Sequence, residues 1–266
     1  MMSIVRAGLF STISWLKNNR AAMLALIVWP YLMAFTILFL GNVFGNPTIF
    51  ASRMGVSNPT LYVLTGGSVA VACLAIVDSV ATSILFHRWL GTLPYILLAP
   101  YNTMAVLLLE PLPTALVTST IPLLAVIPVA VAVEGLCGFA KVLLALALVY
   151  LAMLPLVGFS LIIAAVSLAT KQEHHVFGFV TPFLLMVSGV FYPIDILPEI
   201  LQLVSFLAPP RYVVEAMRIL SMFREPSIVP LARCILALAA LSLLYNFASI
   251  PGVAAMERLI KRSGAI

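Results

Sequence analysis

The residues best suited to chemistry in this chain are two adjacent histidines and the glutamate before them. His174 and His175 follow Glu173 directly. Neighbouring residues on a helix point about 100° apart, whereas helical zinc motifs such as H-E-x-x-H place their ligands at i and i+4. The pattern therefore favours polar residues at a membrane interface. A polytopic enzyme that acts on lipid through these three side chains is the alternative.

Other ionisable side chains lie near the ends of the long apolar runs. Asp78 and Glu110 fall at the same edge of two such runs, and Glu134 and Lys141 flank a turn at the opposite edge. Ionisable residues near the middle of a membrane usually mark proton relays and ion sites. These edge positions argue against a proton-driven or sodium-driven carrier. An ion-coupled carrier or channel that acts without an ATPase is nevertheless the main alternative.

Motifs for nucleotide binding and nucleophilic catalysis are missing from the sequence. It contains no G-x-x-x-x-G-K-[S/T] loop, whose backbone amides would hold phosphate groups. It also contains no G-x-S-x-G elbow. We therefore expect this chain to carry no catalytic residue, no metal ligand and no cofactor site.

The composition indicates that most of the surface faces lipid. Of the 266 residues, 63% are hydrophobic and 9% are charged, whereas a soluble domain carries about 25% charged residues. The net charge of +5 is scattered and forms no basic stripe for nucleic acid. Cys73, Cys137 and Cys234 lie far apart in apolar runs and are expected to be buried free thiols.

The apolar runs predict an all-α membrane protein with a single transmembrane domain over residues 1–266. Residues 3–20 carry one apolar stripe with basic residues between, which predicts an interfacial amphipathic helix rather than a signal peptide. A helix needs about 20 apolar residues to cross the hydrocarbon of a bilayer. Six spans are therefore expected, at about 21–41, 60–84, 107–132, 141–168, 176–192 and 229–252.

The basic residues favour a cytoplasmic location for both termini. Lys17 and Arg20 precede the first span, and Arg258, Lys261 and Arg262 follow the last one. Basic residues accumulate on the cytoplasmic side of membrane proteins, and this orientation places eight of them inside and six outside. We expect a multi-pass protein of the cell (plasma) membrane.

The segment between the second and third spans predicts a short cytoplasmic helix at about residues 92–100. Thr92 can cap its start, and Pro100 would stop it. Its expected apolar face consists of Leu93, Ile96 and Leu97. Such a helix could dock into a partner protein or lie on the lipid surface, and composition does not separate the two.

The segment between the fifth and sixth spans predicts a re-entrant structure at the outer end, over about residues 193–220. The fifth apolar run is short and ends at Pro193, and the following stretch, 194–208, is too short and too interrupted to cross a membrane. Helices that dip into the outer leaflet and return would explain both. Non-helical backbone at that depth must be covered by protein or line a cavity. An ordinary outer loop is the alternative.

These two segments together resemble the membrane subunits of type-2 ATP-binding-cassette transporters. The inner loop of that family typically contains Gly-Thr-Leu, an apolar stretch and a proline, matched here by Gly91, Thr92, Leu93 and Pro100. Its outer segment typically reads Ser-Gly, an aromatic residue, Pro, Leu-Pro and then Pro-x-x-Tyr. The matching residues are Ser188, Gly189, Tyr192, Pro193, Leu197, Pro198, Pro209 and Tyr212.

The resemblance implies the permease subunit of an exporter for an amphipathic, lipid-like, drug-like or polysaccharide cargo. It implies two permease subunits, identical or similar, joined to two separate cassette ATPase subunits that bind ATP and Mg. The residues that it places on the ATPase-coupling helix are Arg88, Gly91, Thr92, Leu93, Tyr95, Ile96, Leu97 and Pro100. The family often has an acidic residue directly after Gly-Thr-Leu. Pro94 in that position implies an apolar rather than ionic contact with the ATPase.

Overall fold

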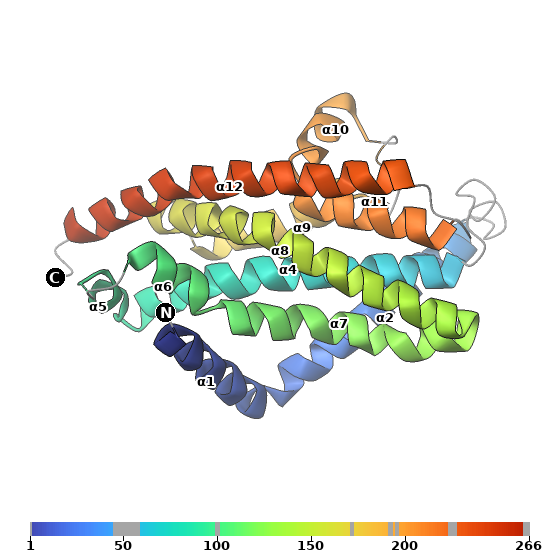
Figure 1. Ribbon diagram of the computed structural model, residues 1–266, viewed down its shortest axis with the longest axis horizontal. Helices are drawn as coiled ribbons and strands as arrows, with labels where there is room; N and C mark the ends of the chain where they lie inside the picture. The colour runs from blue at the N-terminus through green and yellow to red at the C-terminus, as the bar shows by residue number, and fades with distance from the viewer. Residues whose placement is uncertain are drawn as a thin grey trace.

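The computed structural model describes residues 2–44, 59–98, 102–170, 173–190, 194, 197–222 and 228–262. Within these ranges the chain is almost entirely α-helical and contains no β-strand, as Figure 1 shows. Four segments are helical, long and apolar enough to cross a membrane: 63–89, 105–134, 136–170 and 228–255. Shorter apolar helices cover 20–36 and 178–187. The predicted all-α membrane fold is thus confirmed, and the number of six spans stays a prediction.

The helices follow one another with short connections. In chain order they are α1 Met2–Asn18, α2 Arg20–Phe44, α4 Pro59–Trp89, α5 Leu93–Leu98, α6 Thr103–Leu109, α7 Leu112–Glu134, α8 Leu136–Thr170, α9 Glu173–Val187, α10 Glu199–Ser205, α11 Pro209–Met222 and α12 Ile228–Arg262. Helices α4, α7, α8 and α12 run along the long axis of the molecule (Figure 1). The start of α1, the short helices α5 and α6 and the end of α12 lie toward the same end of the molecule.

The core is built around α4 and α8. Their apolar side chains are buried on most sides, and 61% of the α4 span lies inside the protein, against 17% of the α12 span. Helix α12 nevertheless contacts α8 closely, because a Cβ atom at Gly158 would lie only 2.8 Å from the backbone nitrogen of Asn246. Most of the α12 surface therefore faces outward from one subunit.

The third predicted span is divided in the structure. Helix α6 ends at Leu109 and α7 begins at Leu112, with Glu110 and Pro111 in a turn between them. Pro111 has no amide hydrogen for a helical bond, but its carbonyl accepts the amide of Ala115 at 2.9 Å. The turn displaces α6 from the line of α7 and creates a junction beside α5 (Figure 1).

The three cysteines are free, but they are not all buried. Cys73 and Cys234 are buried in α4 and α12, as predicted. Cys137 is exposed, so the prediction of a buried thiol was wrong at this position. It lies in the first turn of α8, directly after the bend at Gly135, where most neighbouring residues are exposed as well.

Candidate functional site

A tight turn joins α4 to α5 and fixes the start of the short helix. Gly91 has a φ of +68°, in the left-handed region that glycine adopts without steric cost. The amide of Thr92 donates to the carbonyl of His87 at 2.9 Å, and the Thr92 hydroxyl donates to the same oxygen at 3.2 Å. The carbonyl of Thr92 then accepts the amides of Tyr95 and Ile96. Thr92 therefore occupies the predicted position at the helix start.

A chain of polar side chains connects this turn to the α6–α7 turn. The hydroxyl of Ser83 donates to Oε2 of Glu110 at 2.5 Å. Nε2 of His87 lies 3.7 Å from the same carboxylate oxygen, and its Nδ1 lies 3.0 Å from the hydroxyl oxygen of Thr92. We name these four residues, Ser83, His87, Thr92 and Glu110, the α5 junction. It ties together α4, α5 and α7.

The α5 junction was only partly visible in the sequence. Sequence analysis placed Glu110 at the correct edge of its apolar run but gave it no partner. Ser83 and His87 were not predicted as its partners, although they stand four residues apart and so share one face of α4. That spacing is the signal that could have linked them.

The apolar face of α5 is turned inward rather than outward. Leu93 is only 2% exposed and belongs to the main core, and Ile96 packs against that core. The side chains presented at the surface are Trp89, Leu90 and Tyr95, of which Tyr95 is 74% exposed. Leu93 therefore anchors α5 in the bundle. The apolar docking face expected from Leu93 and Ile96 was wrong for these two residues.

The structure describes only some of the other residues predicted for the coupling helix. Gly91 is exposed in the turn, and Arg88 is half-buried at the end of α4. Leu97 lies within α5, but its side chain is outside the described part of the structure, and so is all of Pro100.

Helix α1 is seated on the same α6–α7 turn. A Cβ atom at position 8 would overlap the carbonyl oxygen of Glu110 and lie 3.3 Å from the Pro113 ring. One turn further on, the hydroxyl oxygens of Thr12 and Thr114 are 2.8 Å apart, and Thr12 is buried. Gly8 therefore lets α1 approach the backbone of Glu110 directly.

The end of α9 is fixed by a buried turn. Ser188 is buried and its hydroxyl donates to the carbonyl of Leu185 at 2.8 Å. Gly189 follows with a φ of +72°, and its carbonyl accepts a hydrogen bond from the guanidinium of Arg218 in α11. The predicted residues Tyr192 and Pro193 lie outside the described residues.

The following part, residues 197–222, forms the α10–α11 segment, whose turn is tied by side chains to backbone carbonyls. Pro198 precedes α10, and the side-chain Nε2 of Gln202 donates to the carbonyl of Leu197 at 2.8 Å. The hydroxyl of Tyr212 donates to the carbonyl of Phe206 at 2.9 Å. Pro209 is buried at the start of α11, and α11 packs against α4, α8 and α12.

Arg211 reinforces the same turn. One of its guanidinium nitrogens donates to the hydroxyl of Ser205 at 2.5 Å, and its central carbon lies 4.0 Å from the centre of the Phe206 ring. A cation over an aromatic ring is stabilised by the ring quadrupole. These contacts hold the turn between α10 and α11 in one shape.

The histidine pair considered first begins α9. Glu173, His174 and His175 lie in the first turn of this helix, and their side chains are outside the described part of the structure. Within the described ranges, no group of three or more His, Cys, Asp and Glu residues is arranged to hold a metal ion.

A family model with the description ABC-2 type transporter matches residues 14–223. The match covers more than half of the chain and includes the α5 junction and the α10–α11 segment. The comparison with curated proteins gives no match.

Proposed function

Because the chain belongs to the ABC-2 type transporter family, we propose that it is the permease subunit of an exporter driven by a separate ATPase subunit. Two copies, or one copy and a similar chain, would form the membrane part. The ATPase subunits would bind ATP and Mg. The observation that carries this proposal is the short helix α5, held firmly at one end of the bundle with an exposed aromatic surface.

Helix α5 is suited to receive a displacement because it is anchored on one side and exposed on the other. Leu93 fixes its inner face in the core, whereas Trp89, Leu90 and Tyr95 lie at the surface. Tryptophan and tyrosine are enriched among the residues that dominate binding at protein interfaces. We therefore assign the ATPase contact to this exposed surface.

The α5 junction would carry the displacement into the membrane. Glu110 contacts Ser83 and His87 of α4 from the turn that starts α7. Helices α4 and α7 pack side by side along most of their length. A push on α5 would therefore move both spans together, and this movement would change the path between two permease subunits.

The arrangement of the chain ends supports an orientation with α5 in the cytoplasm of the cell. The start of α1 and the end of α12 lie toward the α5 end of the molecule (Figure 1). The α10–α11 segment would then cover the outer end of the bundle. The proposal of an amphipathic or lipid-like cargo rests on the family resemblance alone, because the buried hydroxyls of Ser68, Ser119 and Ser160 are bonded to carbonyls of their own helices.

The proposal is tested by isolating the tagged full-length chain in mild detergent and measuring co-purifying ATPase activity. We expect Tyr95→Ala to lower the retained ATPase by about tenfold, since interface tyrosines often contribute more than 1.4 kcal/mol to binding. The matched control is Leu203→Ala in α10, also an exposed large side chain, which should retain the ATPase fully.

Two results would contradict the proposal at different levels. If the Tyr95 and Leu203 variants retain the same amount of ATPase, α5 is not the contact. If the unmodified chain associates with no ATPase but moves solute in liposomes under an ion gradient, the chain works without an ATPase.

A further inference from the structure

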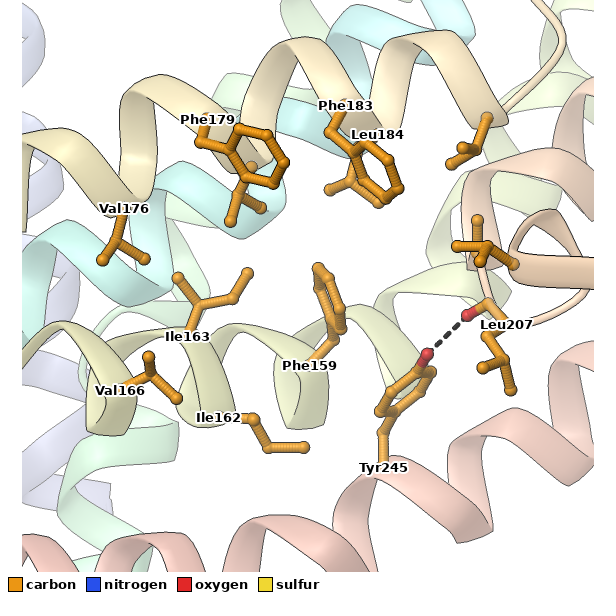
Figure 2. Close-up of a pocket in the computed structure, with 14 residues that line it drawn as sticks. Phe159, Ile162, Ile163, Val166, Val176, Phe179, Phe183, Leu184, Leu207 and Tyr245 are labelled. Carbon is orange, nitrogen blue, oxygen red and sulfur yellow. Dashed lines mark hydrogen bonds between the residues drawn. The ribbon is translucent and has the colours of Figure 1, made fainter. Parts of the chain in front are cut away.

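An apolar cavity lies between α8, α9 and α12, away from the α5 junction. Its volume is about 320 Å³, and 14 residues line it. Figure 2 shows the cavity extending from Val166 and Val176 at one end to Leu207 at the other, alongside α9. All lining side chains are apolar except Tyr245, whose hydroxyl donates to the carbonyl of Leu207.

Aromatic pairs line the cavity on two sides. Phe179 and Phe183 of α9 stack with ring centres 5.5 Å apart. Phe159 of α8 and Tyr245 of α12 meet edge to face at 5.3 Å on the opposite side (Figure 2). Both walls are therefore formed by large apolar rings packed against one another.

Helix α9 leaves this space because it is short and has few neighbours. It has 15 residues, or about 22 Å of helix, less than the ~30 Å hydrocarbon thickness of a bilayer. Its contacts are mainly with α8, and it meets α10 and α4 only briefly. The α10–α11 segment completes the wall beyond its end through Val204 and Leu207.

The chemistry of the cavity favours an apolar occupant. A buried water needs two to four polar partners, and the one hydroxyl in the lining is already hydrogen-bonded. A single alkyl chain needs no polar partner, and it is narrow enough to lie along the cavity.

The cavity is accessible from the side. Val166, Phe179 and Leu207 are each about half exposed or more, and they belong to the lining of the cavity. Helices α8 and α12 are long and apolar enough to cross a membrane, and when they do so this opening lies at the depth of the lipid chains. The long direction of the cavity follows α9 and α8, and therefore the direction of the lipid chains.

We propose that this cavity binds one acyl chain of a bilayer phospholipid, which enters from the side between α8 and α9. The bound chain completes the packing of α9, which the protein alone leaves partial. The site requires only that α8 and α12 lie in the membrane, so it does not depend on the proposed contact between α5 and an ATPase.

The test uses the full-length chain in nanodiscs of phosphatidylethanolamine and phosphatidylglycerol. A small fraction of phosphatidylcholine carries a photoreactive diazirine in the middle of one acyl chain. After irradiation, mass spectrometry locates the labelled residues. We expect labelling of Phe159, Val166, Val180 and Phe183 in the cavity, in addition to labelling of the outward face of α12 around Leu236, which is exposed.

Two variants and one matched control make the result specific. Val180→Trp fills the cavity and should lower its labelling by about tenfold, equivalent to ~1.4 kcal/mol of binding free energy. Phe183→Ala enlarges the cavity and should raise its labelling. Leu236→Trp places the same large ring on the exposed face of α12 and should leave cavity labelling unchanged. Retention of the ATPase by Val180→Trp would separate this site from the α5 contact.

Three results would overturn the proposal. The first is the absence of labelling at the cavity residues while residues around Leu236 are labelled. The second is labelling that Val180→Trp leaves unchanged. The third is cross-linking of Phe179→Cys to a second copy of the chain in place of lipid labelling. Competition by an exported amphiphile but not by added phospholipid would assign the cavity to cargo and also exclude a bilayer lipid.

Discussion

The hydrogen bonds of the α5 junction connect separate helices, whereas those within the α10–α11 segment are local. In the α5 junction, the side chains of Ser83 and Glu110 meet from different elements. In the α10–α11 segment, Tyr212 donates to the carbonyl of Phe206 and Arg211 donates to the hydroxyl of Ser205, both within the segment. A side-chain pair between helices changes when the helices shift, whereas a bond within one segment holds its turn in one shape. We therefore expect the first region to transmit motion and the second to resist it.

The strongest test of this comparison removes the anchor of α5. Leu93→Ala should lower the free energy of unfolding by about 2–5 kcal/mol, because it leaves a cavity in a packed core. Its control is Leu90→Ala, three residues earlier and exposed, which should change stability by less than about 0.5 kcal/mol. Thermal melting in detergent measures both. Equal melting temperatures for the two variants would mean that α5 is not anchored in the bundle.

The next test removes the charge at the centre of the α5 junction. Glu110→Gln should destabilise the chain by roughly 1.5–3 kcal/mol, the usual contribution of a hydrogen bond to a charged group. It should also lower the transport obtained per ATP hydrolysed, because α5 loses its link to α7. Transport and ATP hydrolysis are measured together in liposomes that contain the assembled transporter.

A matched control for this variant exists at the opposite end of the bundle. Glu134 is also a partly buried glutamate, and it pairs with Lys141 at 2.6 Å. Glu134→Gln should reduce stability by a similar amount but leave the ratio of transport to hydrolysis unchanged. If both variants lower this ratio equally, the loss reflects general destabilisation and the α5 junction has no special role.

The smallest expected effect lies in the α10–α11 segment. Tyr212→Phe removes only the hydrogen bond to the Phe206 carbonyl and should lower the free energy of unfolding by about 1 kcal/mol. The ratio of transport to hydrolysis should not change, since this segment keeps its shape during the cycle. A lower ratio of transport to hydrolysis at an unchanged melting temperature would show that the segment moves during the cycle. The α10–α11 segment would then not differ from the α5 junction in this respect.

Sequence patterns predicted the membrane fold well because apolar length alone specifies a spanning helix. They also located the turn before α5 and the turn after α9, because glycine and proline are typical of turns and Gly91 and Gly189 lie at these places. They did not predict which side of α5 is buried. The spacing of Leu93 and Ile96 places them on one face of that helix, but the sequence does not tell whether this face packs against the bundle or against a partner.

The contacts of Glu110 could not be predicted for a different reason. Its partner Ser83 is 27 residues away in the sequence, and the two meet only because α4 and α7 pack together and Pro111 interrupts the third apolar run. The cavity beside α9 is likewise a property of three helices together. Each of its walls, taken alone, is an ordinary apolar helix surface.

The contact between Gly8 and Glu110 has a consequence for the register of the first helix. An amphipathic helix at an interface can usually roll about its own axis, because lipid accommodates many orientations of its apolar face. Here, backbone contact at Gly8 and the hydroxyl pair of Thr12 and Thr114 fix one rotational setting. That setting directs Phe10 and Ile13 outward. Insertion of one residue between Gly8 and Thr12 would turn the two contacts about 100° apart. Helix α1 could then no longer make both contacts, so its rotation about its own axis is fixed.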